Sequence, residues 1–294
     1  MSVRLSSLAW VNQCLDPGEQ IVGVEVLHGG ITAEMRWLTI RTRDGGTRGL
    51  VLRTCVRDEG QLHREAETLS LLAGTGVPAP ALVAVDVTAG SLLMTYLPGR
   101  TYLDDKGVAG RVPLLARQLV AIHALRPTER PPTYTARTTA DTVVIPPNAD
   151  TAAWAAAIDV IRDPAPPYEG RFLHRDFHPG NVLFDVPLRI TGVIDWATAS
   201  WGPADLDVAH CSTNLALLHG PEWGRRFVEA YEEAGGVLGE SGRLYWRVRD
   251  ALAFSEDVRS VARAWRETGR TELTTQVVEE RLDAYVSGLM SGQG

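Results

Sequence analysis

Lysine is nearly absent from this sequence. Lys106 is the only one, so arginine supplies almost all of the positive charge. Chemistry that ordinarily uses a lysine side chain must therefore use arginine here or do without a cation. A surplus of positive charge is missing as well, because the net charge is −7 and the pI is near 5.5. This balance argues against a protein that binds the phosphate backbone of DNA or RNA.

Cysteine is scarce too, and Cys14, Cys55 and Cys211 are scattered without a Cys-x-x-Cys pair. Their spacing predicts free thiols in a reducing compartment and no structural zinc site. No run of about eighteen apolar residues occurs, and the amino terminus lacks the hydrophobic stretch of a signal peptide. We therefore expect a cytoplasmic protein with no membrane partner.

What the sequence does contain is ordinary globular composition, with 45% hydrophobic and 22% charged residues. A chain of 294 residues is long for one compact core and suits two lobes. Up to the break at Pro98-Gly99, short β-rich runs and Gly-containing turns surround one helical pattern. The β-rich runs lie at 21–27, 35–41, 50–56, 81–87 and 92–97, and the helical pattern lies at 61–73.

Beyond that break the apolar residues recur mainly at helical spacing. Helices are predicted over 113–125, 151–161 and 244–265, and proline clusters mark irregular connections between them. The sequence thus predicts an α+β protein of two lobes. A β-rich amino lobe covers 1–97, and a mainly helical carboxyl lobe covers 98–294.

The stretch from 172 to 196 carries a polar centre between apolar flanks, which predicts a loop between two short strands. The loop holds Asp176 and Asn181, and a following strand ends at Asp195. Carboxylate and carboxamide oxygens are the ligands that Mg²⁺ prefers. The spacing Asp176-x-x-x-x-Asn181 matches the kinase catalytic loop, in which the Asp is the base and the Asn a metal ligand. These residues predict phosphoryl transfer, with Asp195 as the second metal ligand.

Residues 174–181 read HRDFHPGN, and residues 194–196 read IDW. Together they resemble the signature of the aminoglycoside/macrolide phosphotransferase family, to which eukaryotic protein kinases are distantly related. The resemblance implies a protein-kinase-like fold that uses ATP, with GTP as the alternative, together with Mg²⁺. It implies that Asp176 and His178 are catalytic and that Asn181 and Asp195 bind the metal.

The same resemblance extends into the amino lobe. Gly29 and Gly30 resemble the family's nucleotide loop, although by themselves they also fit an ordinary turn. Arg53 takes the place of the strand lysine that usually holds the α- and β-phosphates. Glu65 lies on the inward stripe of its helix and is the expected partner of Arg53, the alternative being a solvated helix charge.

The stretch 92–99 resembles the family's adenine-binding linker. Met94 is expected to line the pocket, and the backbone of Thr95, Tyr96 and Leu97 is expected to bond the base. Farther along the chain, Asp207 matches a family residue that braces the catalytic loop.

For function we expect an O-phosphotransferase acting on a hydroxyl of a small sugar-bearing molecule, most readily an antibiotic of aminoglycoside, macrolide or nucleoside type. A metabolic kinase for homoserine, a choline-like alcohol, a thiopentose or a sugar amine is the first alternative, because function lies in the site and not in the fold. A non-catalytic pseudokinase is the second, and the intact Asp176, Asn181 and Asp195 argue against it. The sequence leaves a monomer and a homodimer equally open. Residues 210–294 mix acidic and basic side chains and are expected to set the specificity.

Overall fold

The computed structural model describes residues 5–27, 33–55, 59–136, 138–185, 188–240 and 242–292. The chain divides into two compact units. The first comprises Met1–Gly99 and Thr191–Thr198, and the second comprises Arg100–Ile190 and Ala199–Gly294. The segment that carries Asp195 therefore belongs to the first unit.

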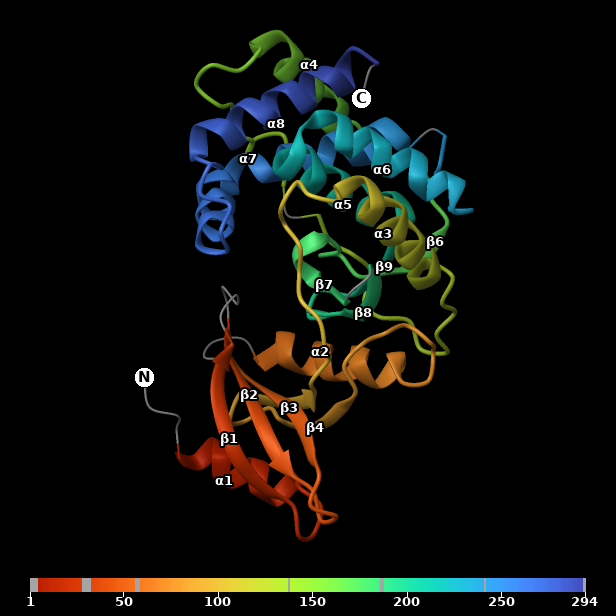
Figure 1. Cartoon of the computed structure of the whole chain (residues 1–294). Helices are drawn as coiled ribbons and strands as arrows, with labels where there is room; N and C mark the ends of the chain where they lie inside the picture. The colour runs from red at the N-terminus through yellow and green to blue at the C-terminus, as the bar shows by residue number, and fades with distance from the viewer. Residues whose placement is uncertain are drawn as a thin grey trace. The chain divides into compact units, whose positions relative to one another are not determined.

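The first unit is built on a five-stranded antiparallel sheet in the order β1-β2-β3-β5-β4 (Figure 1). Its strands are β1 (Gln20–Leu27), β2 (Ala33–Arg41), β3 (Thr47–Cys55), β4 (Leu82–Asp86) and β5 (Ser91–Thr95), and its helices are α1 (Leu5–Cys14) and α2 (Glu59–Leu72). The predicted β-rich amino part is confirmed. The sequence predicted one helix here, however, and α1 is a second one.

Helix α1 forms because the sheet covers its apolar side. Val11 of α1 joins Leu50 and Leu52 of β3 in one buried cluster. A helix of ten residues is marginal alone, so this packing stabilises α1 where local periodicity gave little signal. Alternate residues of a strand face opposite sides, which turns Arg53 away from α1 and toward Glu65 of α2.

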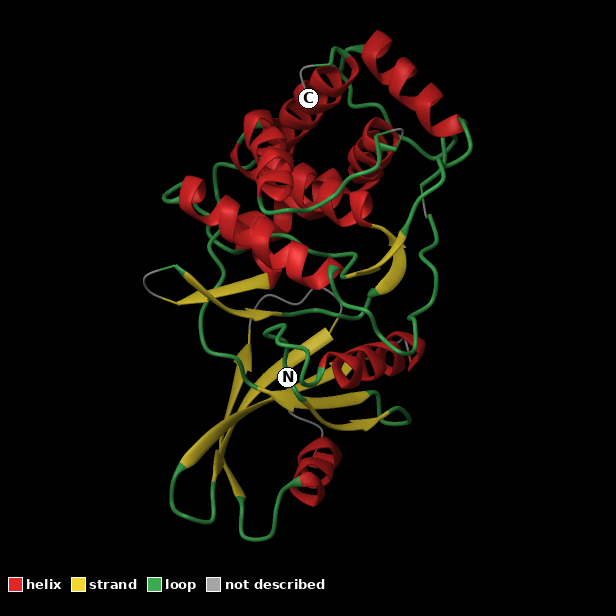
Figure 2. Cartoon of the chain, turned by 90° about the vertical axis from the view of Figure 1, so that its right-hand side faces the viewer, coloured by secondary structure: helices red, strands yellow, loops and turns green. Residues whose placement is uncertain are grey.

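The second unit is mainly helical, as predicted, and Figure 2 shows most of the helices gathered in it. Its helices are α3 (Val108–His123), α4 (Thr151–Arg162), α5 (Ala204–His219), α6 (Pro221–Glu233), α7 (Arg243–Glu267) and α8 (Thr275–Met290). Helix α3 begins five residues before the predicted start at Pro113. Proline lacks a backbone N–H but its φ angle suits a first helical turn, so it is a poor guide to where a helix starts.

The core of the second unit lies where α4, α5, α7 and α8 meet. Trp154, Leu217, Leu252 and Leu282, one from each helix, are fully buried there. Four short strands lie between α4 and α5 in the sequence, namely β6 (Gly170–Leu173), β7 (Val182–Asp185), β8 (Arg189–Val193) and β9 (Ser200–Pro203). Residues 191–193 of β8 belong to the first unit. Strand β6 pairs antiparallel with β9, and α5 follows β9 without a break. Asp207, in the first turn of α5, reaches back to the loop that leaves β6.

In the part of the chain that the structure describes, no helix combines the length and the apolarity needed to cross a membrane.

Candidate active site

The loop of residues 174–181 connects β6 to β7 in the second unit. Asp207, in the first turn of α5, accepts hydrogen bonds at 2.7 Å from the backbone N–H groups of both His174 and Arg175. Its side chain is fully buried and also lies 3.2 Å from Nε2 of His123. Arg175 has a φ of 71°, a left-handed conformation that a side chain of its kind rarely adopts. Asp207 therefore holds the sharp bend that comes directly before Asp176.

Both carboxylate oxygens of Asp176 have a fixed partner. Oδ2 accepts a hydrogen bond from Nδ2 of Asn181 at 2.9 Å, and Oδ1 lies 3.1 Å from Nε2 of His210. Nε2 of His178 is 3.7 Å from the same Oδ1. Burial by itself raises the pKa of Asp176, but His178 and the hydrogen bond to His210 outweigh it and hold the pKa well below its usual range. With 37% of its side chain exposed, Asp176 is an ionised carboxylate that is oriented yet accessible.

Asn181 and His178 are positioned by the short 3₁₀ turn η1 (Pro179–Asn181). Nδ1 of His178 accepts the Gly180 N–H at 3.1 Å, so in the neutral ring the proton resides on Nε2, the nitrogen that faces Asp176. Nδ2 of Asn181 donates to both the carbonyl and the carboxylate of Asp176. Oδ1 is therefore the atom of Asn181 that a cation would meet.

In the first unit the structure brings Arg53, Glu65 and Asp195 together. Nη1 of Arg53 lies 2.7 Å from Oε2 of Glu65 and 3.3 Å from Oδ1 of Asp195. Arg53 and Glu65 are 4% and 2% exposed, whereas 42% of the Asp195 side chain is exposed. Burial raises the pKa of Glu65 to about 7, although Arg53 beside it acts in the opposite direction. Glu65 is thus a packed partner of Arg53 and not a solvated helix charge.

Asp195 follows β8 with a φ of 64°. The Val193 N–H donates to the Pro78 carbonyl at 2.7 Å, and Nε1 of Trp196 donates to the Val193 carbonyl at 2.8 Å. The first bond ties the segment to Pro78, and the second closes a turn within the segment around Asp195. A carboxylate that is half open on a fixed segment has the chemistry of a metal ligand.

The predicted adenine linker lies at the end of β5. Met94 is 5% exposed, and the N–H groups of Thr95 and Tyr96 donate to the carbonyls of Ala81 and Gly49. Of the backbone N–H groups of Thr95, Tyr96 and Leu97 in this predicted linker, that of Leu97 is therefore the one that the sheet does not use. Gly29 and Gly30 lie outside the described residues.

Sequence reasoning missed His210, which contacts Asp176, and Asp250, which contacts His210. His210 lies three residues after Asp207, and this spacing places both side chains on one face of α5; the role predicted for Asp207 could have revealed it. Asp250 lies on α7, and Oδ1 of Asp250 is 3.2 Å from Nδ1 of His210. No local pattern connects Asp250 with the loop, because forty residues separate it from His210.

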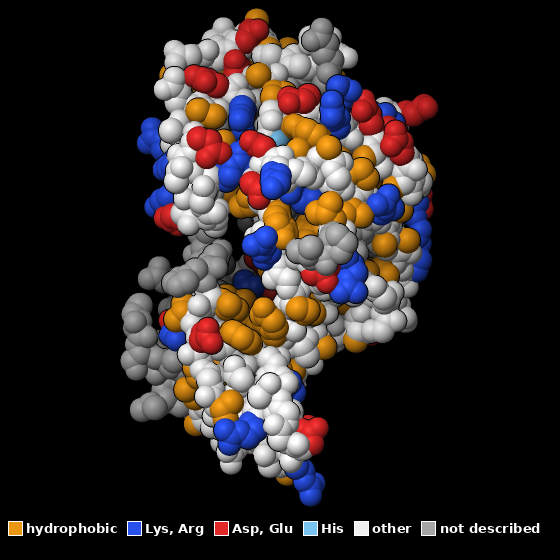
Figure 3. Space-filling model, viewed as in Figure 1, with side chains coloured by type: hydrophobic (Ala, Val, Ile, Leu, Met, Phe, Trp, Pro, Cys, Tyr) orange, Lys and Arg blue, Asp and Glu red, His pale blue; other side chains and the backbone are white. Residues whose placement is uncertain are grey.

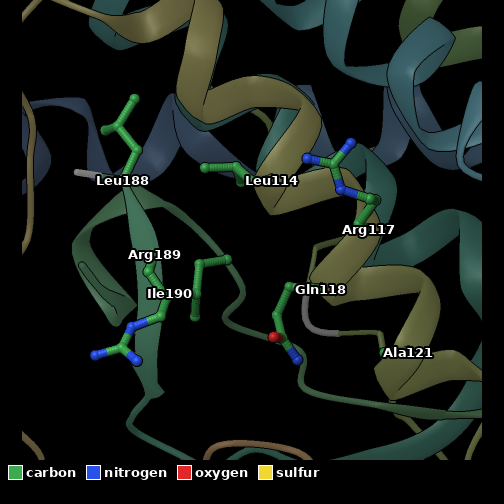
Figure 4. A pocket seen from close by; sticks show the side chains of 7 residues that line it. All are labelled: Leu114, Arg117, Gln118, Ala121, Leu188, Arg189 and Ile190. Carbon is green, nitrogen blue, oxygen red and sulfur yellow. The ribbon is translucent and has the colours of Figure 1, made fainter. Parts of the chain in front are cut away.

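A cavity of about 350 Å³ opens between α3 and residues 188–190 (Figure 4). It is lined by Leu114, Arg117, Gln118, Ala121, Leu188, Arg189 and Ile190. Figure 4 shows the guanidinium groups of Arg117 and Arg189 well apart, on opposite sides of the cavity, so they do not converge on a common anion. None of the residues predicted for catalysis or nucleotide binding lines this cavity.

A kinase-like phosphotransferase has the features described above. They are a β-rich first unit, a helical second unit and an oriented aspartate in the loop between β6 and β7. The family model described as "Phosphotransferase enzyme family" matches residues 24–252, and the chain belongs to this family. The resemblance seen in residues 174–181 is thereby confirmed. Members of this family are described as phosphotransferase enzymes.

Among characterised relatives, the N-acetylmuramate/N-acetylglucosamine kinase of Pseudomonas aeruginosa is 29% identical over 198 residues. The match covers 60% of this chain and 56% of that kinase, so the chain spans little more than half the length of this relative.

Solved structures share the fold at lower identity. An aminoglycoside phosphotransferase in ternary complex with AMP-PNP and hygromycin B aligns with a TM-score of 0.64 at 20% identity, covering 97% of this chain and 99% of that one. The choline kinase LicA from Streptococcus pneumoniae aligns with a TM-score of 0.63 at 17% identity, covering 97% and 98%. These likenesses confirm the α+β, protein-kinase-like fold.

Proposed function

We propose that this enzyme moves the γ-phosphoryl group of ATP to a hydroxyl of a small sugar-bearing molecule, with Mg²⁺ as cofactor and GTP as the alternative donor. The observation that carries the proposal is the Asp176 carboxylate, which Asn181 and His210 hold by one oxygen each while more than a third of its side chain stays exposed. A carboxylate presented in this way can accept the proton of an incoming hydroxyl.

The depressed pKa of Asp176 supports a role in which this carboxylate first orients the hydroxyl and accepts its proton only later. A carboxylate of low pKa is a weak base toward an ordinary alcohol, so Asp176 mainly orients the hydroxyl at first. In a loose transition state the bond from phosphorus to the leaving oxygen is already largely broken when the new oxygen–phosphorus bond forms. The hydroxyl proton becomes acidic only then, and Asp176 accepts it late. His178 is expected to assist by keeping its Nε2–H directed at this carboxylate.

The metal would be held by Oδ1 of Asn181 and the carboxylate of Asp195, which are oxygen donors of the kind that Mg²⁺ requires. When bound, Mg²⁺ neutralises the charge on the β- and γ-phosphates. Arg53, fixed by Glu65, would bind the α- and β-phosphates, and Gly29 with Gly30 would approach the phosphates through their N–H groups. Met94 and the segment from Thr95 to Leu97 would hold the base.

For the acceptor we favour a sugar of low charge over a strongly cationic aminoglycoside. On the face shown in Figure 3, acidic and basic side chains are interspersed on the helical unit and do not form one acidic field. Near Asp176, moreover, the charge of Asp250 is matched by His210. A neutral or weakly charged antibiotic sugar fits these conditions, and we expect the reaction to take place in the cytoplasm.

A metabolic amino-sugar kinase is the second candidate. It is favoured by the relative described as an N-acetylmuramate/N-acetylglucosamine kinase, since that acceptor is also a sugar.

Asp176→Asn and a panel of acceptors test the proposal together. The wild-type enzyme, given ATP, Mg²⁺ and each compound, should add one phosphoryl mass to at least one sugar-bearing antibiotic. Asp176→Asn should lower kcat on that compound by about a hundredfold or more while nucleotide affinity stays near the wild-type value. The matched control is Asp185→Asn, which replaces a β7 carboxylate that pairs with Arg189. This variant should keep its activity. Phosphorylation of an amino sugar alone would select the second candidate, and a fully active Asp176→Asn would refute the assignment of the base.

A further inference from the structure

We propose that His210, anchored by Asp250, is the positioning residue that fixes and neutralises the Asp176 carboxylate during phosphoryl transfer. The inference rests on the proposed role of Asp176 as the group that receives the hydroxyl proton. It assigns a function to two side chains that the catalytic-loop pattern does not contain.

Helix α5 delivers His210 to the loop. Asp207 bonds the loop backbone immediately before Asp176, and His210 stands one helical turn farther on, with Nε2 at 3.1 Å from Oδ1 of Asp176. One rigid helix therefore determines both the bend of the loop and the direction of its carboxylate. The next turn of α5 adds Asn214, whose Nδ2 donates to the His210 carbonyl at 2.9 Å and also lies 3.2 Å from Nε2 of His210.

Helix α7 supplies the support behind the ring. Oδ1 of Asp250 lies 3.2 Å from Nδ1 of His210, and the Phe254 ring, one turn later, lies 5.5 Å from the imidazole at 32°. Asp250 is 7% exposed. Within the described residues, its second oxygen, Oδ2, is buried without a hydrogen-bond partner. A buried carboxylate with so little compensation needs the charge of His210.

The ring is thus placed between two carboxylates, one on each nitrogen. Both nitrogens can act as donors only when the imidazole is protonated. The titratable groups that face the ring are Asp176 and His178 from the loop and Asp250 from α7. Burial alone would lower the pKa of His210, but Asp250 and Asp176 raise it to about 10. The two flanking carboxylates thus favour the imidazolium form of His210.

Such an imidazolium would have two effects. It keeps Asp176 from rotating, since Oδ1 is tied to His210 and Oδ2 to Asn181. It also offsets one negative charge where the phosphate oxygens must approach. Both effects act on the transfer step, so loss of His210 should lower kcat and leave the KM for nucleotide almost unchanged.

The first test compares substitutions at position 210. His210→Ala should lower kcat by about tenfold to a hundredfold with nucleotide KM within about twofold of wild type. His210→Gln, which keeps a donor, should recover part of the loss, and added imidazole should partly restore His210→Ala. His63→Ala removes an exposed histidine of α2 that pairs with Glu67 and should behave as wild type. An unchanged kcat in folded His210→Ala, or equal losses in kcat and nucleotide affinity, would overturn the proposal.

The second test begins with the wild-type protein, so its first measurement needs no substitution. In the wild-type protein, ¹⁵N spectra of histidine at pH 8 should show both ring nitrogens of His210 protonated. Asp250→Asn should make this ring neutral at the same pH and lower kcat, whereas Asp257→Asn, an exposed carboxylate of the same helix, should do neither. A neutral His210 in the wild-type protein at pH 8 would refute the inference even if His210→Ala failed to fold.

Parallel assays of Asp176→Asn separate the two proposals. If Asp176→Asn is inactive while His210→Ala and Asp250→Asn are fully active, the positioning role is wrong and the proposed base stands. If Asp176→Asn retains its activity, the proposed base itself is wrong.

Discussion

At the scale of single residues, the first unit depends on one buried ion pair. Arg53 and Glu65 are almost completely enclosed, and their 2.7 Å contact joins β3 to α2. A buried pair gives up hydration that its mutual attraction only partly returns. The pKa of Glu65, raised from 4.5 to about 7 mainly by burial, expresses that cost. Arginine at position 53 stays charged at any physiological pH, so protonation changes in this pair fall on Glu65.

The raised pKa of Glu65 predicts a pH-dependent stability. A carboxyl group with a higher pKa in the folded state contributes stability that is fully present below its unfolded pKa and is lost as pH rises through the folded value. Between pH 4.5 and about 7, the wild-type free energy of unfolding should therefore lose up to about 3 kcal/mol through this group. Glu65→Gln should remove that slope when denaturant midpoints are measured without metal or nucleotide across this range. Glu67→Gln, an exposed neighbour on α2, should retain it, and an unchanged slope in Glu65→Gln would contradict the prediction.

At the scale of elements, α5 organises the catalytic loop from its first two turns. Its Asp207 satisfies two backbone N–H groups of the loop and contacts His123 of α3, so one side chain joins three segments. Burial acts to raise the pKa of Asp207, but His123 and the neighbouring cations hold it below its usual range. The conformation of the loop, including the left-handed Arg175, is therefore stabilised by α5.

Asp207→Asn tests this dependence. An asparagine side chain has one oxygen, whereas the Asp207 carboxylate uses two to accept the His174 and Arg175 N–H groups. One of these backbone N–H groups would therefore be left unpaired, at a cost of about 1–3 kcal/mol. We expect a lower melting temperature together with a fall in kcat of at least about tenfold, because Asp176 would lose its orientation. Asp205→Asn changes another buried carboxylate in the same helical turn whose contact with the Gly239 N–H is long, at 3.4 Å. It should affect kcat much less, and equal effects of the two substitutions would argue against a specific brace.

How much the sequence predicted depends on whether the information is local. The spacing from Asp176 to Asn181 and the periodicity of α2 lie within short stretches, so the loop and the Arg53–Glu65 pair could be predicted. Helix α1 was not predicted, because its stability comes from packing on the sheet. Asp250 was not predicted, because its contact with His210 arises from the packing of α7 on α5 and no residue spacing in the sequence indicates it.

At the scale of the whole molecule, ligand binding should be visible as stability. A ligand that binds only the folded state adds RT ln(1 + [L]/Kd), or about 2.7 kcal/mol at a hundred times Kd. ATP with Mg²⁺ should therefore raise the melting temperature more than ATP with EDTA does. Asp195→Ala should abolish the Mg²⁺-dependent increment and the turnover, whereas Asp86→Asn, a turn carboxylate that accepts the Ala89 N–H, should preserve both. If the increment persisted in Asp195→Ala, the metal ligand would have to be sought elsewhere.

The return of Thr191–Thr198 to the first unit has a consequence for biosynthesis. When residue 99 has left the ribosome, the sheet and α2 are complete in sequence, but Pro78 still lacks the Val193 N–H and Arg53 still lacks Asp195. Both partners appear only after roughly another hundred residues, which at about 5–20 residues per second takes several seconds. During that interval the nascent first unit lacks both of these contacts.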